Sequence, residues 1–165
     1  MSGAPATPLL EVEGLRTTFP TRAGLVTAVD DVSITVGAGE CIGVVGESGS
    51  GKSVAFLSVL GLVRAPGRVE ARRLAFDGID LMALDESGRR AMRGRDIAIT
   101  MQDALTALNP AFTVSTQITE VMLAHGRAAS MGEARAKAVE MMRLVGIPAA
   151  ASRLDDYPHQ FSGGM

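Results

Sequence analysis

Residues 46–53 read GESGSGKS and match in full the pattern G-x-x-x-x-G-K-[ST], in which a glycine-rich loop holds phosphate groups. Glycine allows backbone angles and close approaches that a Cβ would forbid, so the amides of such a loop can curl around a phosphate. Lys52 is then placed to bridge the β- and γ-phosphates, and the hydroxyl of Ser53 to bind Mg²⁺. The motif therefore predicts a site for a nucleoside triphosphate and its magnesium ion.

The predicted nucleotide-binding residues cover the whole loop and the residue after it. They are Gly46, Glu47, Ser48, Gly49, Ser50, Gly51, Lys52, Ser53 and Val54. Lys52 is also assigned a catalytic role at the γ-phosphate. The chain holds only two lysines beside fourteen arginines, which argues against a chance lysine here. The alternative is a Gly- and Ser-rich turn that merely links two elements. It is disfavoured because the motif is complete and is flanked by a predicted strand and a predicted helix, as a phosphate-binding loop requires.

The flanks of the loop are the elements that must position it. Residues 40–45 (ECIGVV) form a short apolar run rich in β-branched side chains, which predicts a parallel strand buried on both faces. Residues 54–63 (VAFLSVLGLV) predict an apolar helix with no breaker before Gly61. A strand, a glycine loop and a helix N-terminus in this order direct backbone N–H groups and the positive end of a helix dipole at one place, which suits a polyphosphate.

The composition is that of one globular domain with a real core, since 165 residues suffice to bury about two thirds of the unfolded surface. A net charge of −2 gives no electrostatic reason to expect nucleic acid as the main partner. The single cysteine, Cys41, falls in the predicted buried strand, which favours a core residue and a reducing compartment. The longest apolar run is too short to cross a bilayer and no secretory signal is visible, so a membrane role is expected to come through a partner protein.

Short strands are predicted before and after the loop. Residues 9–36 read as antiparallel strands around a turn at 20–24 (PTRAG), and residues 68–81 as two strands bent at Asp77 and Gly78, a favoured hairpin pair. Residues 88–95 are expected to be a basic, solvated stretch, and residues 96–101 (DIAITM) a further compact strand.

The last third of the sequence is predicted to be helical. One helix is expected over residues 113–125, and Ser130 with Glu133 forms a capping box before a second. The second helix should end at Gly146 and Pro148. Its expected buried stripe consists of Ala134, Ala138, Met141, Met142 and Val145.

Two further motifs narrow the choice among nucleotide-binding proteins. Gln102 directly follows a predicted strand and opens the loop QDALTALNP, and residues 161–165 read FSGGM. Together with the glycine loop they resemble the ATP-binding-cassette (ABC) ATPases, in which a glutamine loop and a helical insertion lead to an L-S-G-G-Q signature. The NP-x-x-TV segment and the YPHQ-x-SGGM ending are closest to the branch that powers oligopeptide and dipeptide import in bacteria, where the fifth signature residue is commonly Met.

The resemblance covers almost the whole chain and implies an α/β fold. It implies a P-loop NTPase (RecA-like) core with an N-terminal antiparallel β subdomain and an α-helical insertion, with the C-terminal part of the fold missing. Residues 1–101 would be the nucleotide-binding core with its β subdomain, and residues 102–165 the glutamine loop and helical subdomain ending in the signature. The family's Mg²⁺-binding aspartate, catalytic glutamate and switch histidine would follow Met165, so ATP turnover by these 165 residues alone is not expected.

The resemblance also implies roles for residues outside the loop. Phe19 would stack on adenine, the alternative being an ordinary edge-strand phenylalanine. Gln102 would be a catalytic residue and a Mg²⁺ ligand, the alternative being a surface amide. Ser162, Gly163 and Gly164 would contact the γ-phosphate of ATP held by a second cassette, the alternative being a simple turn.

The function implied is that of an ATP-binding subunit that couples ATP binding and hydrolysis to peptide import across the bacterial inner membrane. Its cofactors would be ATP and Mg²⁺, and its partners transmembrane permease subunits and a second ABC ATPase subunit, without nucleic acid and without direct membrane insertion. It would sit peripherally on the cytoplasmic face of the membrane. Two alternatives remain open, a cassette protein that acts without a transporter and a truncated nucleotide-binding fragment without hydrolytic activity.

Overall fold

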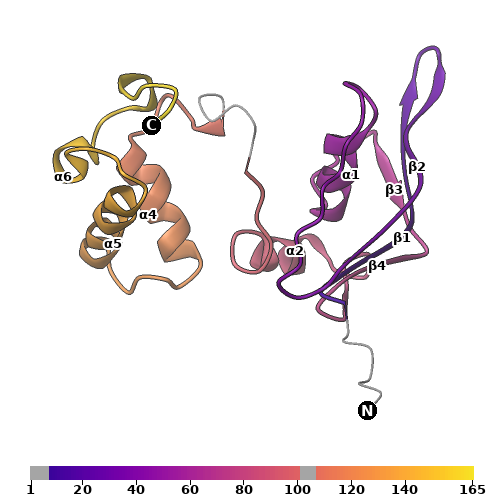
Figure 1. Ribbon diagram of the computed structural model, residues 1–165, viewed down its shortest axis with the longest axis horizontal. Helices are drawn as coiled ribbons and strands as arrows, with labels where there is room; N and C mark the ends of the chain where they lie inside the picture. The colour runs from indigo at the N-terminus through magenta and orange to yellow at the C-terminus, as the bar shows by residue number, and fades with distance from the viewer. Residues whose placement is uncertain (1–7, 101–106) are drawn as a thin grey trace. The chain divides into compact units, whose positions relative to one another are not determined.

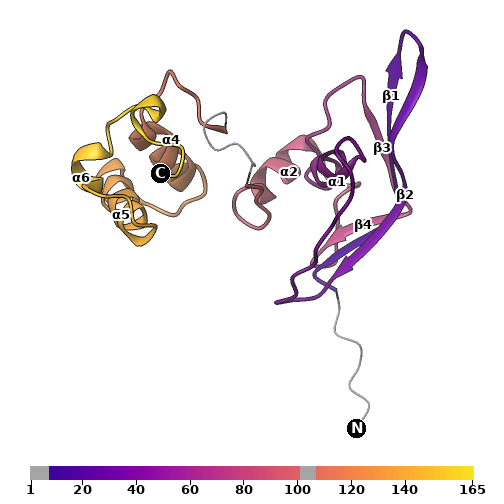
Figure 2. The same ribbon diagram turned by 45° about the horizontal axis from the view of Figure 1, so that its top comes forward.

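The computed structural model describes residues 8–100 and 107–165. The backbone forms two compact units, Met1–Arg90 and Ala91–Met165, each of which is described by itself. The first unit holds an antiparallel sheet and the helix that follows the glycine loop, and the second is built from helices (Figures 1 and 2). This combination of sheet and helices confirms the predicted α/β class.

The sheet of the first unit is built around a long hairpin. Strands β1 (Leu10–Thr21) and β2 (Gly24–Val36) are antiparallel, and Thr21 pairs with Gly24, so the turn between them is tighter than the predicted five-residue turn. The sheet has the order β2-β1-β4-β5, and β3 (Arg68–Glu70) also pairs with β1. Val12, Leu15 and Thr17 of β1 are buried on its covered face, and the break in alternation between Val12 and Leu15 coincides with a shift of register.

The predicted second hairpin is also confirmed. Strands β4 (Arg73–Phe76) and β5 (Ile79–Asp80) are antiparallel and joined at Asp77 and Gly78. Both joining residues have positive φ, 48° at Asp77 and 75° at Gly78. Positive φ at both central positions is the requirement of the turn type that matches the twist of two strands, and Asp-Gly meets it at low cost.

Helix α1 (Lys52–Val59) packs on the sheet through a buried pair of hydroxyl groups. The hydroxyl oxygens of Thr17 in β1 and Ser58 in α1 lie 2.7 Å apart, and both residues are almost fully buried. Ser58 donates its hydrogen to the carbonyl oxygen of Val54 at 2.7 Å. Thr17 must therefore be the donor to Ser58, because a serine hydroxyl carries a single hydrogen.

We expect Ser58→Ala to lower the free energy of unfolding by about 1–3 kcal/mol, because the buried Thr17 hydroxyl would lose its acceptor. Urea unfolding measures the change. In the double variant Thr17→Val, Ser58→Ala the loss should be smaller than the sum of the single losses. The control is Ser152→Ala, whose exposed hydroxyl donates only to Ala149. Equal stability of Ser58→Ala and the parent would contradict a role of this pair in docking α1.

Helix α1 ends earlier than predicted, and the reason is local. Gly61 has a φ of 64°, and its amide donates to Ser58 at 3.0 Å, while the amide of Leu62 donates to Leu57 at 2.8 Å. These two bonds form the glycine-centred stop in which the last carbonyl groups of a helix are satisfied by the turn itself. The apolar run over residues 54–63 is thus a helix to Val59 followed by a turn.

The predicted strand over residues 40–45 is wrong for this structure. These residues form an exposed coil that leads into the glycine loop, and Cys41 is exposed rather than in a core. A parallel strand exists only through hydrogen bonds to neighbours. Among residues 8–100 and 107–165 no strand pairs with this segment. The residue types favour a strand, but the partner that would bury it is not provided by the described part of the chain.

Two predictions for residues 88–101 are also wrong. Helix α2 (Glu86–Met92) covers much of the stretch expected to be merely solvated, and its residue Met92 is buried. The expected strand over residues 96–101 is not formed over residues 96–100, where Ile97 makes only an isolated bridge to Arg93. Met101 lies outside the described residues.

Two helices of the second unit begin after a capping side chain, and the cap at Ser130 is the one that the sequence predicts. Helix α4 (Val114–Ala124) begins after Thr113, whose hydroxyl accepts from the Thr116 amide at 3.2 Å. Helix α5 (Met131–Leu144) begins after Ser130, which accepts from the Glu133 amide at 3.2 Å. The carboxylate of Glu133 reaches back to the amide of Ala129, one residue before the expected cap position. Two short elements complete the unit, α6 (Ala150–Arg153) and the 3₁₀ turn η1 (Pro158–Gln160).

The core of the second unit lies between these helices and confirms only part of the expected stripe. Ala134, Ala138 and Met142 are buried, whereas Met141 is 55% exposed and Val145 74% exposed. The buried face of α5 is therefore narrower than predicted and consists mainly of Ala134, Ala138 and Met142. The buried cluster consists of Val114, Met122, Ala128, Ala134, Ala138, Met142, Ala150 and Leu154.

Candidate functional site

The glycine loop leads directly into a helix whose first turn has no side-chain cap. Gly51 precedes α1 with a φ of 90°, and Gly49 has a φ of 82°. The first N–H groups of a helix have no partner within it, and here no side chain accepts from them either. These amides, together with the positive end of the helix dipole, are available to an anion.

The ammonium of Lys52 closes the loop upon itself. It donates to the carbonyl oxygens of Gly46 at 2.7 Å and Glu47 at 2.6 Å, and to the hydroxyl of Ser50 at 3.1 Å. An ammonium has three donors, and all three are directed at oxygen atoms of the loop. Phosphate oxygens are stronger acceptors than neutral carbonyl and hydroxyl oxygens, so the same donors can serve a polyphosphate.

The loop also has the close contacts that its glycines predict. A Cβ at Gly46 would lie 2.9 Å from the hydroxyl oxygen of Ser50, and one at Gly51 would overlap the carbonyl oxygen of Ala28 in β2. The loop is therefore a cradle that side chains at these two positions would fill or displace. Its residues fit the phosphates of a nucleotide.

One residue of the first turn fits a magnesium ion. Ser53 is the second residue of α1 and is exposed, so its hydroxyl can reach a cation beside the phosphates. In the described part of the chain, no group of three His, Cys, Asp or Glu side chains could hold a metal ion. A cation there would take its remaining ligands from phosphate and water, which is the usual coordination of Mg²⁺ in nucleotide sites.

Phe19 lies in β1, on the hairpin whose second strand contacts the loop. It pairs with Val26, two residues before Ala28, whose carbonyl is packed against Gly51. The ring is half-buried and lies close to Gly67, where an added Cβ would be 2.6 Å from its Cε1 atom. An aromatic ring can stack on an adenine ring. Stacking on adenine stays a prediction.

Gln102, predicted to be a Mg²⁺ ligand, lies outside the described residues. The described residues resume at residue 107. Gln117 of α4 accepts from the amide of Asn109 at 2.8 Å and donates to the carbonyl oxygens of Asn109 and Phe112 at 3.0 and 3.1 Å. One side-chain amide thus fixes the Asn-Pro turn to the first part of α4, a contact that local sequence patterns did not reveal.

The Ser-Gly-Gly residues form an exposed turn in the second unit. The amide of Met165 donates to the carbonyl oxygen of Ser162 at 2.9 Å, while Ser162, Gly163 and Gly164 are exposed. The glycine loop belongs to the first unit and this turn to the second. The exposure of the turn is compatible with its predicted contact with a phosphate.

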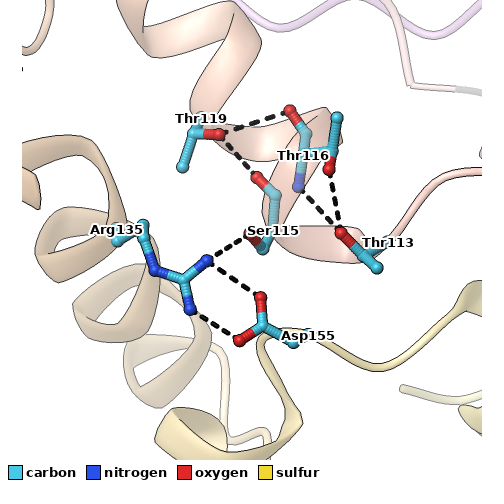
Figure 3. A network of polar contacts seen from close by, with 6 residues as sticks. All are labelled: Thr113, Ser115, Thr116, Thr119, Arg135 and Asp155. Carbon is cyan, nitrogen blue, oxygen red and sulfur yellow. Dashed lines mark hydrogen bonds and ion pairs between the residues drawn. The ribbon is translucent and has the colours of Figure 1, made fainter. Parts of the chain in front are cut away.

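The segment before the turn is fixed to α4 by an arginine that sequence reasoning missed. Figure 3 shows Arg135 of α5 reaching both Ser115 at the start of α4 and Asp155. Its guanidinium donates to the Ser115 hydroxyl at 2.7 Å and to the two carboxylate oxygens of Asp155 at 2.8 and 2.6 Å. The first amides of α4 add two bonds, from Val114 to the Asp156 carbonyl and from Ser115 to the Leu154 carbonyl.

The Arg135 guanidinium, hydrogen-bonded to Asp155, lowers the pKa of that carboxyl group. A pKa lower in the folded than in the unfolded state means that the ionised pair stabilises the fold above the unfolded value of about 3.9, and that this contribution disappears as the pH falls through the folded value. We expect Asp155→Asn to flatten the decline of stability below about pH 4, measured by urea unfolding at several pH values. Glu140→Gln, at an exposed position of α5, is the control; an unaltered decline in Asp155→Asn would contradict the prediction.

Comparisons with known proteins give one consistent result. The sequence profile of a family described as "ABC transporter" matches residues 29–165. The dipeptide transport ATP-binding protein DppD of Escherichia coli is 46% identical over 157 residues, which cover 95% of this chain and 48% of the relative. The oligopeptide transport ATP-binding protein OppD of Salmonella typhimurium is 43% identical over 161 residues, covering 98% of this chain and 48% of the relative.

A solved structure shares the fold. The dimeric structure of the ATP-binding cassette MJ0796 in a post-hydrolysis state, bound to ADP and Pi, matches with a TM-score of 0.78 at 22% identity. The match covers 93% of this chain and 63% of that chain. The chain spans about half the length of the curated relatives it matches. Across the described residues, none of the helices has both the length and the apolar character to cross a membrane.

Proposed function

The chain belongs to the ABC transporter family, and on that premise we propose that it is the ATP-binding subunit of a bacterial peptide importer. In this role it couples ATP binding and hydrolysis to peptide uptake across the inner membrane. The observation that carries the proposal is the glycine loop closed by Lys52 at the uncapped start of α1. The choice of peptides as the transported class is supported by the dipeptide and oligopeptide transport proteins among its relatives.

The glycine loop, Phe19 and Gln102 together bind and orient the nucleotide. The amides of residues 46–54 surround the β-phosphate, and Lys52 exchanges its carbonyl partners for β- and γ-phosphate oxygens. Ser53 and Gln102 hold Mg²⁺, which neutralises charge on the phosphate oxygens when it is bound. Phe19 stacks on the adenine ring. Lys52 and Gln102 are the catalytic residues that this chain contributes.

The residues of the second unit serve a neighbouring subunit. Ser162, Gly163 and Gly164 present a hydroxyl and amides to the γ-phosphate held by a second ABC ATPase subunit, as supported by the exposure of the turn. Functionally, residues 1–101 form the nucleotide-binding core and residues 102–165 the glutamine loop and the helical subdomain. The glutamine loop contacts the transmembrane permease subunits, and the chain lies peripherally on the cytoplasmic face of the inner membrane.

A second function applies to these 165 residues on their own, namely nucleotide binding without turnover. It is supported by the exposed coil over residues 40–45, since no strand among the described residues pairs with the segment that leads into the loop. Hydrolysis needs an attacking water held in line with the γ-phosphate, and none of the residues assigned above provides a general base for that water.

Both functions are tested by measuring MgATP binding and hydrolysis for the 165-residue chain beside a version extended by the remaining C-terminal part of a longer relative such as DppD, of which the chain covers 48%. We expect both to bind MgATP and only the extended version to turn it over. Comparable turnover by the short chain would overturn the second function. Failure of both proteins to bind MgATP would overturn the nucleotide site itself.

A further inference from the structure

Arg153, the last residue of α6, makes a set of contacts that converge on the Ser-Gly-Gly turn. Its guanidinium carbon lies 5.1 Å from the ring centre of Phe161, the residue before the turn. One amino group donates to the carbonyl oxygen of Gln160 and the other to the sulfur of Met165, each at 3.4 Å. A single guanidinium therefore touches the chain on both sides of residues 162–164.

Each of these contacts is long and therefore weak, but together they restrain the residues on both sides of the turn. The planar guanidinium offers its face to an aromatic ring and its edge to acceptors at the same time. Its third nitrogen, Nε, lies 3.6 Å from the carboxylate of Asp156, which limits rotation of the side chain. The arginine side chain is 30% exposed, so these contacts are only partly shielded from water.

The base from which Arg153 reaches the turn is itself fixed. Leu154 and Asp156 accept hydrogen bonds from the first amides of α4, and Asp155 between them is held by Arg135 on two oxygen atoms (Figure 3). Leu154 is also one of the most deeply buried residues of the chain. Arg153 therefore connects a rigid segment to an exposed turn that has only one internal backbone bond, from Met165 to Ser162.

We propose that Arg153 is a positioning residue that holds the Ser162, Gly163 and Gly164 turn in the shape in which its amides can meet a phosphate. The shape of the turn is inferred only from contacts within this chain. The identity of the phosphate, as part of ATP bound to a second subunit, rests on the proposed function. Two glycines in succession give the backbone wide freedom, and an unbraced turn would lose order that phosphate binding would then have to restore.

The first test measures the order of the turn in the 165-residue chain. Backbone NMR relaxation of the Gly163 and Gly164 amides is compared among the parent, Arg153→Gln, Arg153→Lys and the control Arg143→Gln, which changes an exposed arginine of α5. We expect order parameters in the parent and the control near the rigid value of about 0.85, and in Arg153→Gln below about 0.6. Unchanged order in Arg153→Gln would overturn the proposal.

The lysine variant tests whether charge alone suffices. Lysine keeps the positive charge beside Asp156 but lacks the planar fork, so it cannot contact Phe161, Gln160 and Met165 together. We expect the turn in Arg153→Lys to be nearly as mobile as in Arg153→Gln. Full recovery of order with lysine would overturn the guanidinium-specific role. Thermal unfolding of each variant shows whether the helical unit remains folded.

The second test separates this proposal from the proposed function. In the extended protein we expect Arg153→Gln to leave MgATP affinity at the Lys52 loop unchanged and to lower kcat roughly tenfold or more, with Arg143→Gln unaltered. A parent that binds no MgATP would refute the proposed function while the NMR result still decides the role of Arg153. An active parent with an unchanged Arg153→Gln kcat would refute the positioning role alone.

Discussion

Lys52→Ala should weaken MgATP binding about 30- to 150-fold, the equivalent of about 2–3 kcal/mol for lost hydrogen bonds from a charged donor. The ammonium is the one cationic group placed inside the loop, and its three partners there are oxygen atoms of Gly46, Glu47 and Ser50. Alanine removes both the charge and the donors. In the extended protein the same change should abolish turnover, since the γ-phosphate would lose its positive counterpart. Isothermal titration calorimetry with MgATP measures the affinity.

The chain supplies its own matched control in its other lysine. Lys137 of α5 forms an ion pair with Glu133 at 2.7 Å and donates to the carbonyl oxygen of Arg127. Lys137→Ala removes the same charge from the same protein, so MgATP affinity should stay at the parent value. Equal weakening in both variants would attribute the effect to net charge, and undiminished binding in Lys52→Ala would refute the phosphate role of Lys52.

Gly51→Ala should destabilise the first unit by more than about 3 kcal/mol, which is large for the addition of one methyl group. The φ of 90° is already unfavourable for alanine, and the new Cβ would overlap the carbonyl oxygen of Ala28, a backbone atom that no rotamer change can move aside. Either the start of α1 or the middle of β2 must shift. Nucleotide binding should be lost together with stability, because the displaced segment carries the loop amides.

Gly49→Ala separates the two causes. Gly49 has a similar φ of 82°, but nothing lies within 4 Å of an added Cβ. Its cost should therefore be about 1–2 kcal/mol, from the left-handed backbone alone. Urea unfolding followed by circular dichroism gives both values, and the difference between them reports the contact with Ala28. A Gly51→Ala variant no less stable than Gly49→Ala would show that α1 does not pack on β2 as described.

Elements whose signals are local were predicted well from the sequence. The Asp77-Gly78 hairpin and the cap at Ser130 depend on residues within four positions of each other, and both are found. Residues 40–45 are also of types that favour a strand, but they form a coil. A strand needs hydrogen bonds to a neighbouring strand, and the residues of the segment itself cannot show whether that neighbour is present.

In the candidate site, too, features formed by neighbouring residues were predictable and features formed by distant residues were not. The loop around Lys52 was predictable because its glycines, lysine and serine are consecutive, and the structure places them as one cradle. The pairing of Arg135 with Asp155 joins residues twenty positions apart, and each is an ordinary surface residue in its own sequence context. Met141 shows the opposite error: it has the spacing of a core residue, yet it is exposed, because the buried face of α5 extends only over Ala134, Ala138 and Met142.

The hydrogen bonds of Lys52 within the loop affect the thermodynamics of phosphate binding. Because Lys52 already gathers the carbonyl groups of Gly46 and Glu47, the backbone is preorganised, and little conformational entropy remains to be removed on association. The arriving phosphate acts as a competitor for an ammonium that is already in position. The temperature dependence of binding should then reflect exchange of one set of oxygen partners for another, with a small heat-capacity change from the loop itself.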